Sequence, residues 1–321
     1  MGPFDFRFPA RIIGGPGAVN GLGSLVRDLH ASRVLVISRG STASAEARIV
    51  SILRDAGLTV VDHEDEATDL VLTFGAEPQG KPVSDAPARR SIHVPILASA
   101  GVPASPHAPG GERLADVVVL DHELSAGIPR DELADAMLDA TACAIEAWVS
   151  TRRTVMSDWC AREAWRQLAA SVPRLLNGSD DAESMGPALL GWFLAGTAAR
   201  HATLGAVHAC ARPVSRRYGV PHGTALALLL PEVVRWNSRV VADRYAELAA
   251  IRGEARRPET LVARLEDLVA AGPFPERLAA AGVVERELPT LAVEASADQV
   301  GEFNPRKFDV AGALQIYAAA Y

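Results

Sequence analysis

Four side chains that can bind a divalent metal ion stand out in this sequence: Asp139, Cys143, His208 and His222. Asp139 and Cys143 are four positions apart in a helical pattern, so both side chains lie on one face of that helix. Zinc and ferrous iron accept carboxylate, imidazole and thiolate ligands, and the soft sulfur of Cys143 favours zinc. Each residue also has an ordinary interpretation, as a surface acid, a buried thiol or a core histidine. Ligands from separate segments indicate a metal site in a cleft.

The elements that must position these residues change in kind partway along the chain. The first part has short apolar runs rich in β-branched residues, which predict a parallel α/β sheet. These runs are RIIGG, RVLVIS (33–38), TVVDHE, DLVLTF (69–74), IHVPIL and ADVVVLD (115–121). From about Pro129, long alanine- and leucine-rich helical patterns dominate. The sequence therefore predicts an α/β domain over residues 1–127 and a helical domain over residues 128–321, with the ligand cleft between them.

The composition is typical of a globular cytoplasmic protein. The chain has 321 residues, of which 49% are hydrophobic and 22% charged, so two domains can each bury a core. The net charge is −7 and no cluster of basic and aromatic residues occurs, which argues against a nucleic-acid partner. No stretch of about 18 uninterrupted apolar residues occurs, so we expect no membrane insertion. An odd count of three cysteines fits a reducing compartment, the cytoplasm.

The segment VPHGTALALLLPEVVRWN resembles the signature of the iron-containing alcohol dehydrogenase superfamily, in which a Pro-His-Gly turn opens a buried helix. The segment LADAMLDATACAIEAWVS is similar to another helix of that family. The resemblance implies that Asp139, His208 and His222 are metal ligands and that Cys143 stands where relatives have a histidine. It also implies the dehydroquinate synthase-like, iron alcohol dehydrogenase fold: a Rossmann-like α/β domain, here trimmed, followed by an all-α domain. The two ends of the chain resemble the maleylacetate reductase branch.

The resemblance breaks down between residues 60 and 115, where relatives bind the pyrophosphate of a nicotinamide cofactor. In relatives a strand runs into Gly-Gly-Gly-Ser, whose backbone amides hold the phosphates. Here the corresponding segment, residues 75–82, has two prolines that remove amide donors and a glutamate that adds negative charge. The candidate NAD(P) contacts that remain are Gly75, Gly80, Lys81, Ser99 and Gly101. The alternative is that these are ordinary loops and that the cofactor binds through other contacts.

Arg212 stands where relatives often carry a second histidine, close to the nicotinamide and the substrate. A guanidinium stays protonated, so it cannot act as an ordinary acid or base, but it can clamp a carboxylate or a phosphate. With His208 and His222, Arg212 is therefore a candidate catalytic residue, and it predicts a small anionic substrate. Arg216 and Arg217 lie nearby in the sequence, although a solvated helix face would account for both.

Three kinds of function are open to such a chain. The first is an NAD(P)-dependent reductase or dehydrogenase in which zinc or iron polarises the carbonyl of a small substrate. The second is a non-redox enzyme (a lyase, dehydratase, isomerase or cyclase) that keeps the cleft without the hydride donor. The third is a catalytically silent partner subunit. The resemblance also implies a homodimer that pairs through the N-terminal domain, and, in the maleylacetate reductase branch, redox chemistry that does not depend on the metal.

Overall fold

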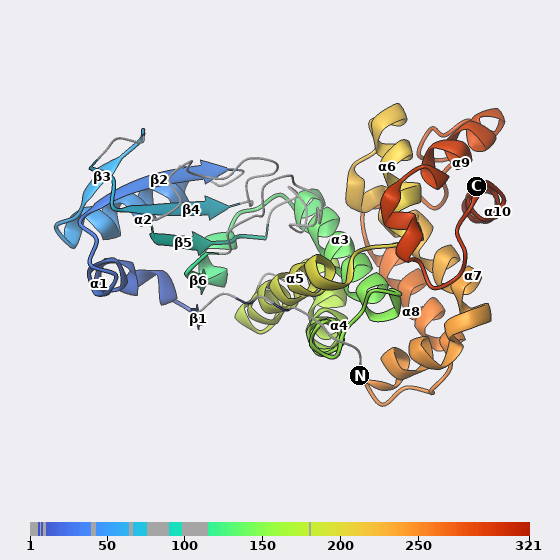
Figure 1. The fold of residues 1–321 in the computed structure, drawn as a ribbon, viewed down its shortest axis with the longest axis horizontal. Helices are drawn as coiled ribbons and strands as arrows, with labels where there is room; N and C mark the ends of the chain where they lie inside the picture. Colours follow the sequence, from blue (N-terminus) through green and yellow to red (C-terminus); the bar gives the residue numbers. More distant parts are fainter. Residues whose placement is uncertain are drawn as a thin grey trace.

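The computed structural model describes residues 6, 8, 11–39, 43–63, 67–75, 90–97, 115–179 and 181–321. A parallel sheet with its helices occupies the first part of the chain, and helices alone occupy the second part (Figure 1). This confirms the predicted fold class. The last strand ends at Leu120 and the first long helix of the second part begins at Arg130. The domain boundary predicted between residues 127 and 128 falls in this interval and stays a prediction.

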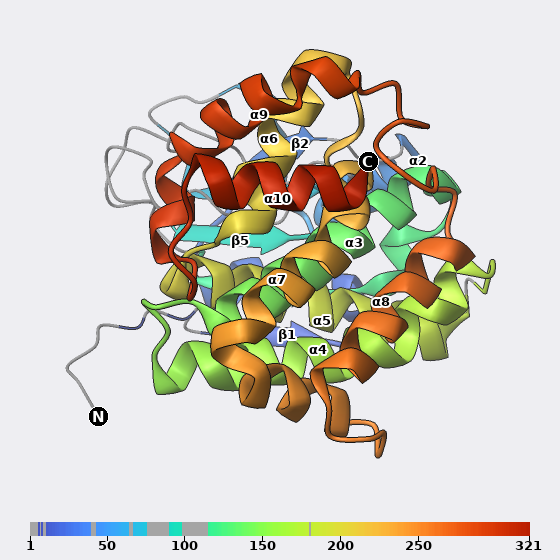
Figure 2. The ribbon, with the colours of Figure 1, turned by 90° about the vertical axis from the view of Figure 1, so that its right-hand side faces the viewer.

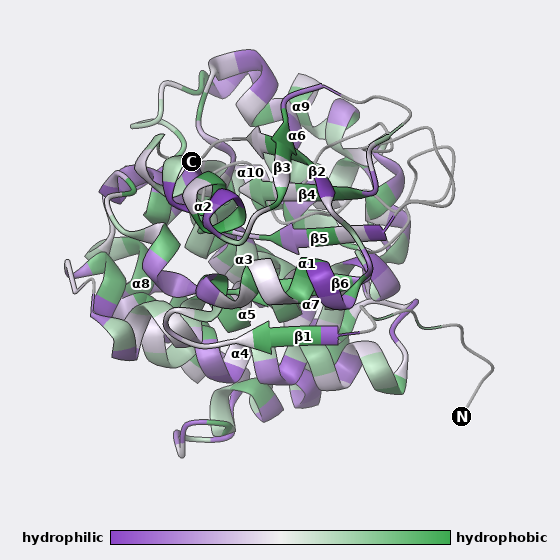
Figure 3. Cartoon of the chain, turned by 90° about the vertical axis from the view of Figure 1, so that its left-hand side faces the viewer, coloured by the Kyte–Doolittle hydropathy of each residue, from purple (hydrophilic) through white to green (hydrophobic). Residues whose placement is uncertain are grey.

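Each of the six predicted apolar runs forms a strand, and over the residues that the structure describes these strands make one six-stranded sheet (Figure 3). The strands are β1 (Arg11–Gly14), β2 (Arg33–Arg39), β3 (Thr59–Val61), β4 (Leu70–Gly75), β5 (Arg90–Val94) and β6 (Val117–Leu120). Their order is β1-β6-β5-β4-β2-β3, and every neighbouring pair is parallel. The strand β4 lies near the middle of the sheet and is buried along most of its length, as its unbroken apolar sequence requires.

The helices α1 (Leu22–Asp28) and α2 (Ala43–Asp55) cover apolar side chains of the sheet. Their buried leucine, valine and isoleucine side chains form one core cluster with apolar residues of β2, β4, β5 and β6. The chain passes from β2 through α2 to β3 at one edge, and then returns to form β4 on the other side of β2. In open parallel sheets, ligands bind outside the carboxyl ends of the strands at such a switch point.

The helical part is built around α3 (Arg130–Val149), whose side chains are almost all buried and which packs against α4, α5 and α7. Figure 2 shows this part from the side opposite the sheet. The other helices are α4 (Val155–Leu176), α5 (Ala182–Ala202), α6 (Ala206–Tyr218), α7 (His222–Ala250), α8 (Pro258–Ala271), α9 (Leu288–Ser296) and α10 (Val310–Ala320). Short 3-10 helices are η1 (Ala18–Gly21), η2 (His122–Ser125), η3 (Glu285–Glu287) and η4 (Gln299–Phe303). Over the ranges that the structure describes, no helix is long and apolar enough to cross a membrane.

Two glycines set the path of the chain between α6 and α7. Gly219 ends α6 with a φ of 66°, a left-handed conformation that glycine adopts without strain. Gly223 lies in the first turn of α7, where an added Cβ would be 2.0 Å from the backbone oxygen of Asp135 on α3. Because only a residue without a side chain fits there, α7 can begin directly against α3. His222, the first residue of α7, is thereby held beside that helix.

Candidate metal centre

Asp139, His208 and His222 come together although they lie on three different helices. One ligand atom from each residue can be chosen so that the three atoms all lie within 4.8 Å of one another. The two imidazole rings have centroids 5.5 Å apart. Asp139 and His208 are buried, at 5% and 3% exposure, and His222 is partly buried. The packing of α3, α6 and α7 against one another therefore assembles three of the four donors that the sequence suggested.

Cys143 adjoins this group without being one of its three members. Its Sγ atom lies 3.5 Å from Oδ1 of Asp139 and 3.6 Å from Nε2 of His208. The thiol is completely buried, one helical turn after Asp139 on α3. Asp139 and Cys143 therefore share one face of α3, as the sequence predicted. This face brings the sulfur of Cys143 into contact with Asp139 and His208.

Glu146, which the sequence analysis did not single out, orients His208. Its Oε2 lies 2.5 Å from Nδ1 of His208, and its Oε1 accepts a hydrogen bond of 2.6 Å from the backbone N–H of Val207. Because a carboxylate only accepts, Nδ1 donates to Glu146, which leaves Nε2, directed toward Asp139 and Cys143, as the ring nitrogen that a metal ion would take. The spacing of residues 139, 143 and 146 along one helical face was the signal that could have identified Glu146.

The charges at the centre suit a cation. Burial opposes a charge on His208, but the charges and hydrogen bonds of Cys143, Glu146 and Asp139 outweigh burial and raise the pKa of His208 well above its ordinary value. Burial, together with the positive charge of His208, lowers the pKa of His222 to about 4. Burial also raises the pKa of the Cys143 thiol to about 12. Buried carboxylates, imidazoles and a thiol are a donor set that a divalent metal ion fits, because the ion compensates the negative charge.

Arg212 has a carboxylate partner within the chain. Its Nη1 donates to both carboxylate oxygens of Asp298, at 2.9 and 2.8 Å, just after α9. Arg216 and Arg217, one turn further along α6, are both paired with Glu294 on α9. The catalytic role of Arg212 stays a prediction, and an anionic substrate group would have to share the guanidinium with Asp298.

An acidic cavity of about 750 Å³ opens onto His222. Asp131, Glu132 and Asp135 line it from the start of α3, and Tyr218 lines it from the end of α6. Asp135 accepts a hydrogen bond of 2.7 Å from the backbone N–H of Thr224, and burial raises the pKa of its carboxyl group. These carboxylates were not recognisable from the sequence, because each is an ordinary helix-start acid until the turn before His222 packs against them.

Of the candidate cofactor contacts, the structure describes Gly75. It ends β4 and is paired in register with Arg39, the last residue of β2, so it lies at the switch point of the sheet. Its φ of 93° is a conformation that favours glycine. Gly80, Lys81, Ser99 and Gly101 lie outside the described residues.

The sequence is similar to those of known alcohol dehydrogenases and reductases. Probable alcohol dehydrogenase EutG of Salmonella typhimurium is 30% identical over 208 residues, which are 64% of this chain and 53% of the relative. Lactaldehyde reductase of Escherichia coli is 29% identical over 220 residues, 65% of this chain and 56% of the relative. The matched region thus spans about half the length of these curated relatives.

Solved structures share the fold along the whole chain. A crystal structure of 1,3-propanediol oxidoreductase has a TM-score of 0.85 and 23% identity, covering 99% of this chain and 100% of the other. Maleylacetate reductase from Agrobacterium tumefaciens has a TM-score of 0.80 and 23% identity, covering 100% of this chain and 99% of the other. The model of the C-terminal region of the Fe-containing alcohol dehydrogenase family matches residues 133–321, which hold all four candidate ligands. The chain therefore belongs to the Fe-containing alcohol dehydrogenase family.

Proposed function

We propose that the protein is an oxidoreductase that interconverts a small carbonyl compound and its alcohol, with a nicotinamide cofactor and a bound divalent metal ion. The observation that carries this proposal is the convergence of Asp139, His208 and His222 within 4.8 Å of one another. The names of relatives, such as lactaldehyde reductase and 1,3-propanediol dehydrogenase, support small hydroxy and carbonyl compounds as the substrate class.

The residues of the chain would act mainly by positioning. Asp139, His208 and His222 would hold the metal, which when bound supplies a Lewis acid for a substrate carbonyl. Glu146 keeps the proton of His208 on Nδ1 and so keeps Nε2 available as a ligand atom. Burial of Asp139 and His208 keeps water from competing for these donor atoms. His222 is the donor that borders the acidic cavity, so a small molecule could reach the centre from that side.

The topology of the sheet supports a site for the nicotinamide cofactor. The carboxyl ends of β2 and β4, at Arg39 and Gly75, form the switch point at which nucleotides bind in open parallel sheets. Sulfoacetaldehyde reductase from Bifidobacterium kashiwanohense, a solved structure in complex with NAD⁺, shares the fold with a TM-score of 0.84. We propose the switch point at Arg39 and Gly75 as the NAD(P) site of this chain.

A calorimetric titration of the metal-assayed protein with NADH and with NADPH tests the proposal first. Binding of either cofactor, followed by its oxidation when small aldehydes, hydroxyaldehydes and oxo acids are supplied, is the expected result. A His222→Ala variant should lose this turnover, whereas His63→Ala, at an exposed histidine of the sheet region, should keep it. If neither cofactor binds, the oxidoreductase proposal fails. A substrate that is converted without any nicotinamide would replace it with a non-redox enzyme on this fold, and the absence of any turnover would favour a catalytically silent subunit.

A further inference from the structure

We infer that Cys143 binds the metal ion as a thiolate and that this ligand makes the centre prefer zinc to ferrous iron. The inference rests on the metal site of the proposed function, but it concerns binding and holds whether or not the protein transfers hydride. Cys143 is the residue at the centre whose chemistry differs most from the nitrogen and oxygen donors around it.

The distances around the sulfur fit a shared ion. Zinc–nitrogen and zinc–oxygen bonds are about 2.0–2.2 Å and zinc–sulfur bonds about 2.3 Å, so two ligands of one tetrahedral ion lie roughly 3.6 Å apart. The Sγ atom of Cys143 is 3.5 Å from Oδ1 of Asp139 and 3.6 Å from Nε2 of His208. The sulfur is therefore at ligand spacing from Asp139 and His208, whereas it stands outside the group of three donors, Asp139, His208 and His222, that lie within 4.8 Å of one another.

The sulfur is buried together with the two donors that it contacts. Cys143 has none of its surface exposed, and Asp139 and His208 have 5% and 3%. An ion held by these groups would be shielded from water, and the Glu146 carboxylate beside His208 adds to the negative charge that a divalent cation would offset.

The other two cysteines are buried without such contacts, so they show what burial alone explains. Cys160 and Cys210 are also buried, as small apolar side chains often are. Cys160 has its pKa raised by burial alone. At Cys210 the backbone oxygen accepts a hydrogen bond of 2.7 Å from the hydroxyl of Tyr317. Of the three, Cys143 has its sulfur in contact with a carboxylate and an imidazole. Burial explains Cys160 and Cys210, whereas the neighbours of Cys143 are those of a ligand.

Cobalt provides a direct test, because a cobalt–thiolate bond absorbs strongly in the near ultraviolet and cobalt–nitrogen or cobalt–oxygen bonds do not. Metal-free full-length protein titrated with Co²⁺ should develop this absorption at one equivalent. The absorption should be absent in Cys143→Ser and unchanged in Cys160→Ser, which is the matched control. Cys143→His, which restores a nitrogen ligand, should bind cobalt without the band and shows that the position tolerates a ligand of another kind.

Competition between metals tests the preference. Metal-free wild type and Cys143→His are equilibrated anaerobically with equal zinc and ferrous iron, and the bound metals are counted by mass spectrometry. We expect the ratio of bound zinc to bound iron to fall about tenfold or more in Cys143→His. Substitutions of residues that only orient a ligand already change metal affinity by about this factor. If the wild type binds cobalt without the thiolate absorption, Cys143 is not a ligand. If wild type and Cys143→His bind zinc and iron in the same ratio, Cys143 does not set a preference for zinc. Cofactor oxidation by a protein that binds no metal would overturn this inference and leave the oxidoreductase function standing.

Discussion

The Oε2 atom of Glu146 lies 2.5 Å from Nδ1 of His208, and the same carboxylate receives the backbone N–H of Val207 at the start of α6. One buried side chain of α3 thus sets both where α6 begins and which nitrogen of His208 faces the other donors.

Replacing Glu146 should weaken metal binding without removing a ligand. In Glu146→Gln the acceptor for Nδ1 loses its charge, so His208 becomes a poorer ligand and zinc affinity should fall about 10- to 100-fold. Glu163→Gln on the surface of α4 is the control, because Glu163 bonds to Arg166 and Gln167 and is remote in sequence from the centre. Competition with a chromophoric chelator measures the affinity. Equal zinc affinities in Glu146→Gln and wild type would show that Glu146 does not support metal binding by His208.

Removing the metal should lower thermal stability. An ion that binds only the folded chain adds about 2.7 kcal/mol at a free concentration 100 times its Kd, so Tm should rise by a few degrees with zinc and fall again with a chelator. His222→Ala should lose this response. Differential scanning calorimetry of wild type, His222→Ala and the exposed control His63→Ala makes the comparison. A zinc response that survives in His222→Ala would place the ion elsewhere.

Gly223 is required by the contact between α7 and α3. A Cβ at this position would lie 2.0 Å from the backbone oxygen of Asp135, so Gly223→Ala must push the start of α7 away from α3. We expect a loss of about 2–4 kcal/mol in the free energy of unfolding, together with weaker metal binding through His222. Gly186→Ala in α5, where the nearest atom would be 3.7 Å away, should be neutral or stabilising by up to about 1 kcal/mol. Urea unfolding measures the free energy of unfolding of both variants. Equal values would contradict the close approach of Gly223 to the backbone of Asp135.

The ion pair between Arg212 and Asp298 should contribute modestly to stability. The Arg212 side chain is 37% exposed, so solvent screens the pair and a coupling energy of about 1 kcal/mol or less is expected. A double-mutant cycle with Arg212→Ala and Asp298→Ala measures it. The same Arg212→Ala variant tests the anionic substrate: KM should rise for an oxo acid and stay unchanged for a neutral aldehyde if the guanidinium also holds substrate.

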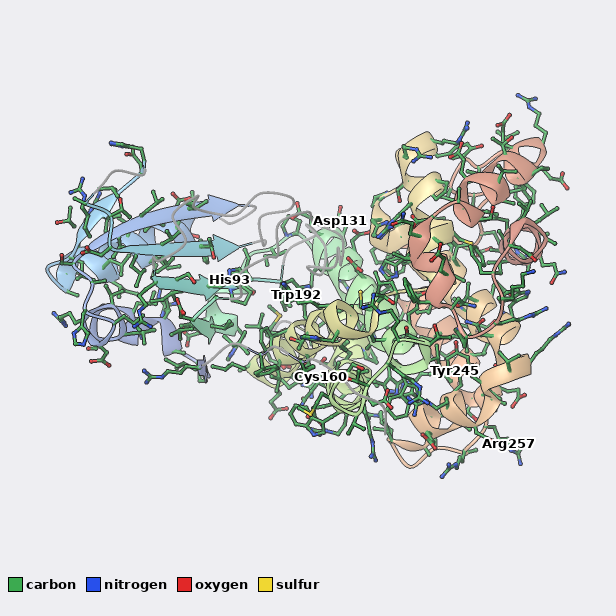
Figure 4. The ribbon with its side chains drawn as sticks, in the orientation of Figure 1. His93, Asp131, Cys160, Trp192, Tyr245 and Arg257 are labelled. Atoms are coloured by element: carbon green, nitrogen blue, oxygen red, sulfur yellow. The ribbon has the colours of Figure 1, made fainter. Side chains whose placement is uncertain are left out.

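His93 should make stability depend on pH. It lies on β5, at the end of the sheet nearest the helical part (Figure 4), where its Nδ1 is 2.8 Å from the hydroxyl of Thr73. Burial lowers the pKa of His93 to about 4, while an unfolded histidine titrates near 6.5. The unfolded state therefore binds more protons between these values, and stability is lost as pH falls through this window, by at most about 3 kcal/mol. His93→Gln should flatten the dependence between pH 7 and pH 4.5 in urea unfolding, whereas His63→Gln should not. An unchanged slope in His93→Gln would show that His93 is not the group responsible.

The sequence by itself determined the local features of this protein. Six apolar runs predicted the six parallel strands, because a buried strand needs an unbroken apolar stretch, and the helical spacing of Asp139 and Cys143 placed them on one face of α3. The family was also readable, since its motifs are short and continuous, and the family comparison confirms it.

Only the tertiary structure decided which distant groups meet. Glu146 and His208 are 62 positions apart, and Arg212 and Asp298 are 86 positions apart. Local periodicity says which face of a helix is buried, but it does not say which residue of another helix lies against that face. That choice depends on how α3, α6, α7 and α9 pack, down to the absent side chain of Gly223. The candidate ligands could therefore be predicted from their residue types and local spacing. Their partners, such as Glu146 for His208, could be identified only from the packing of the helices.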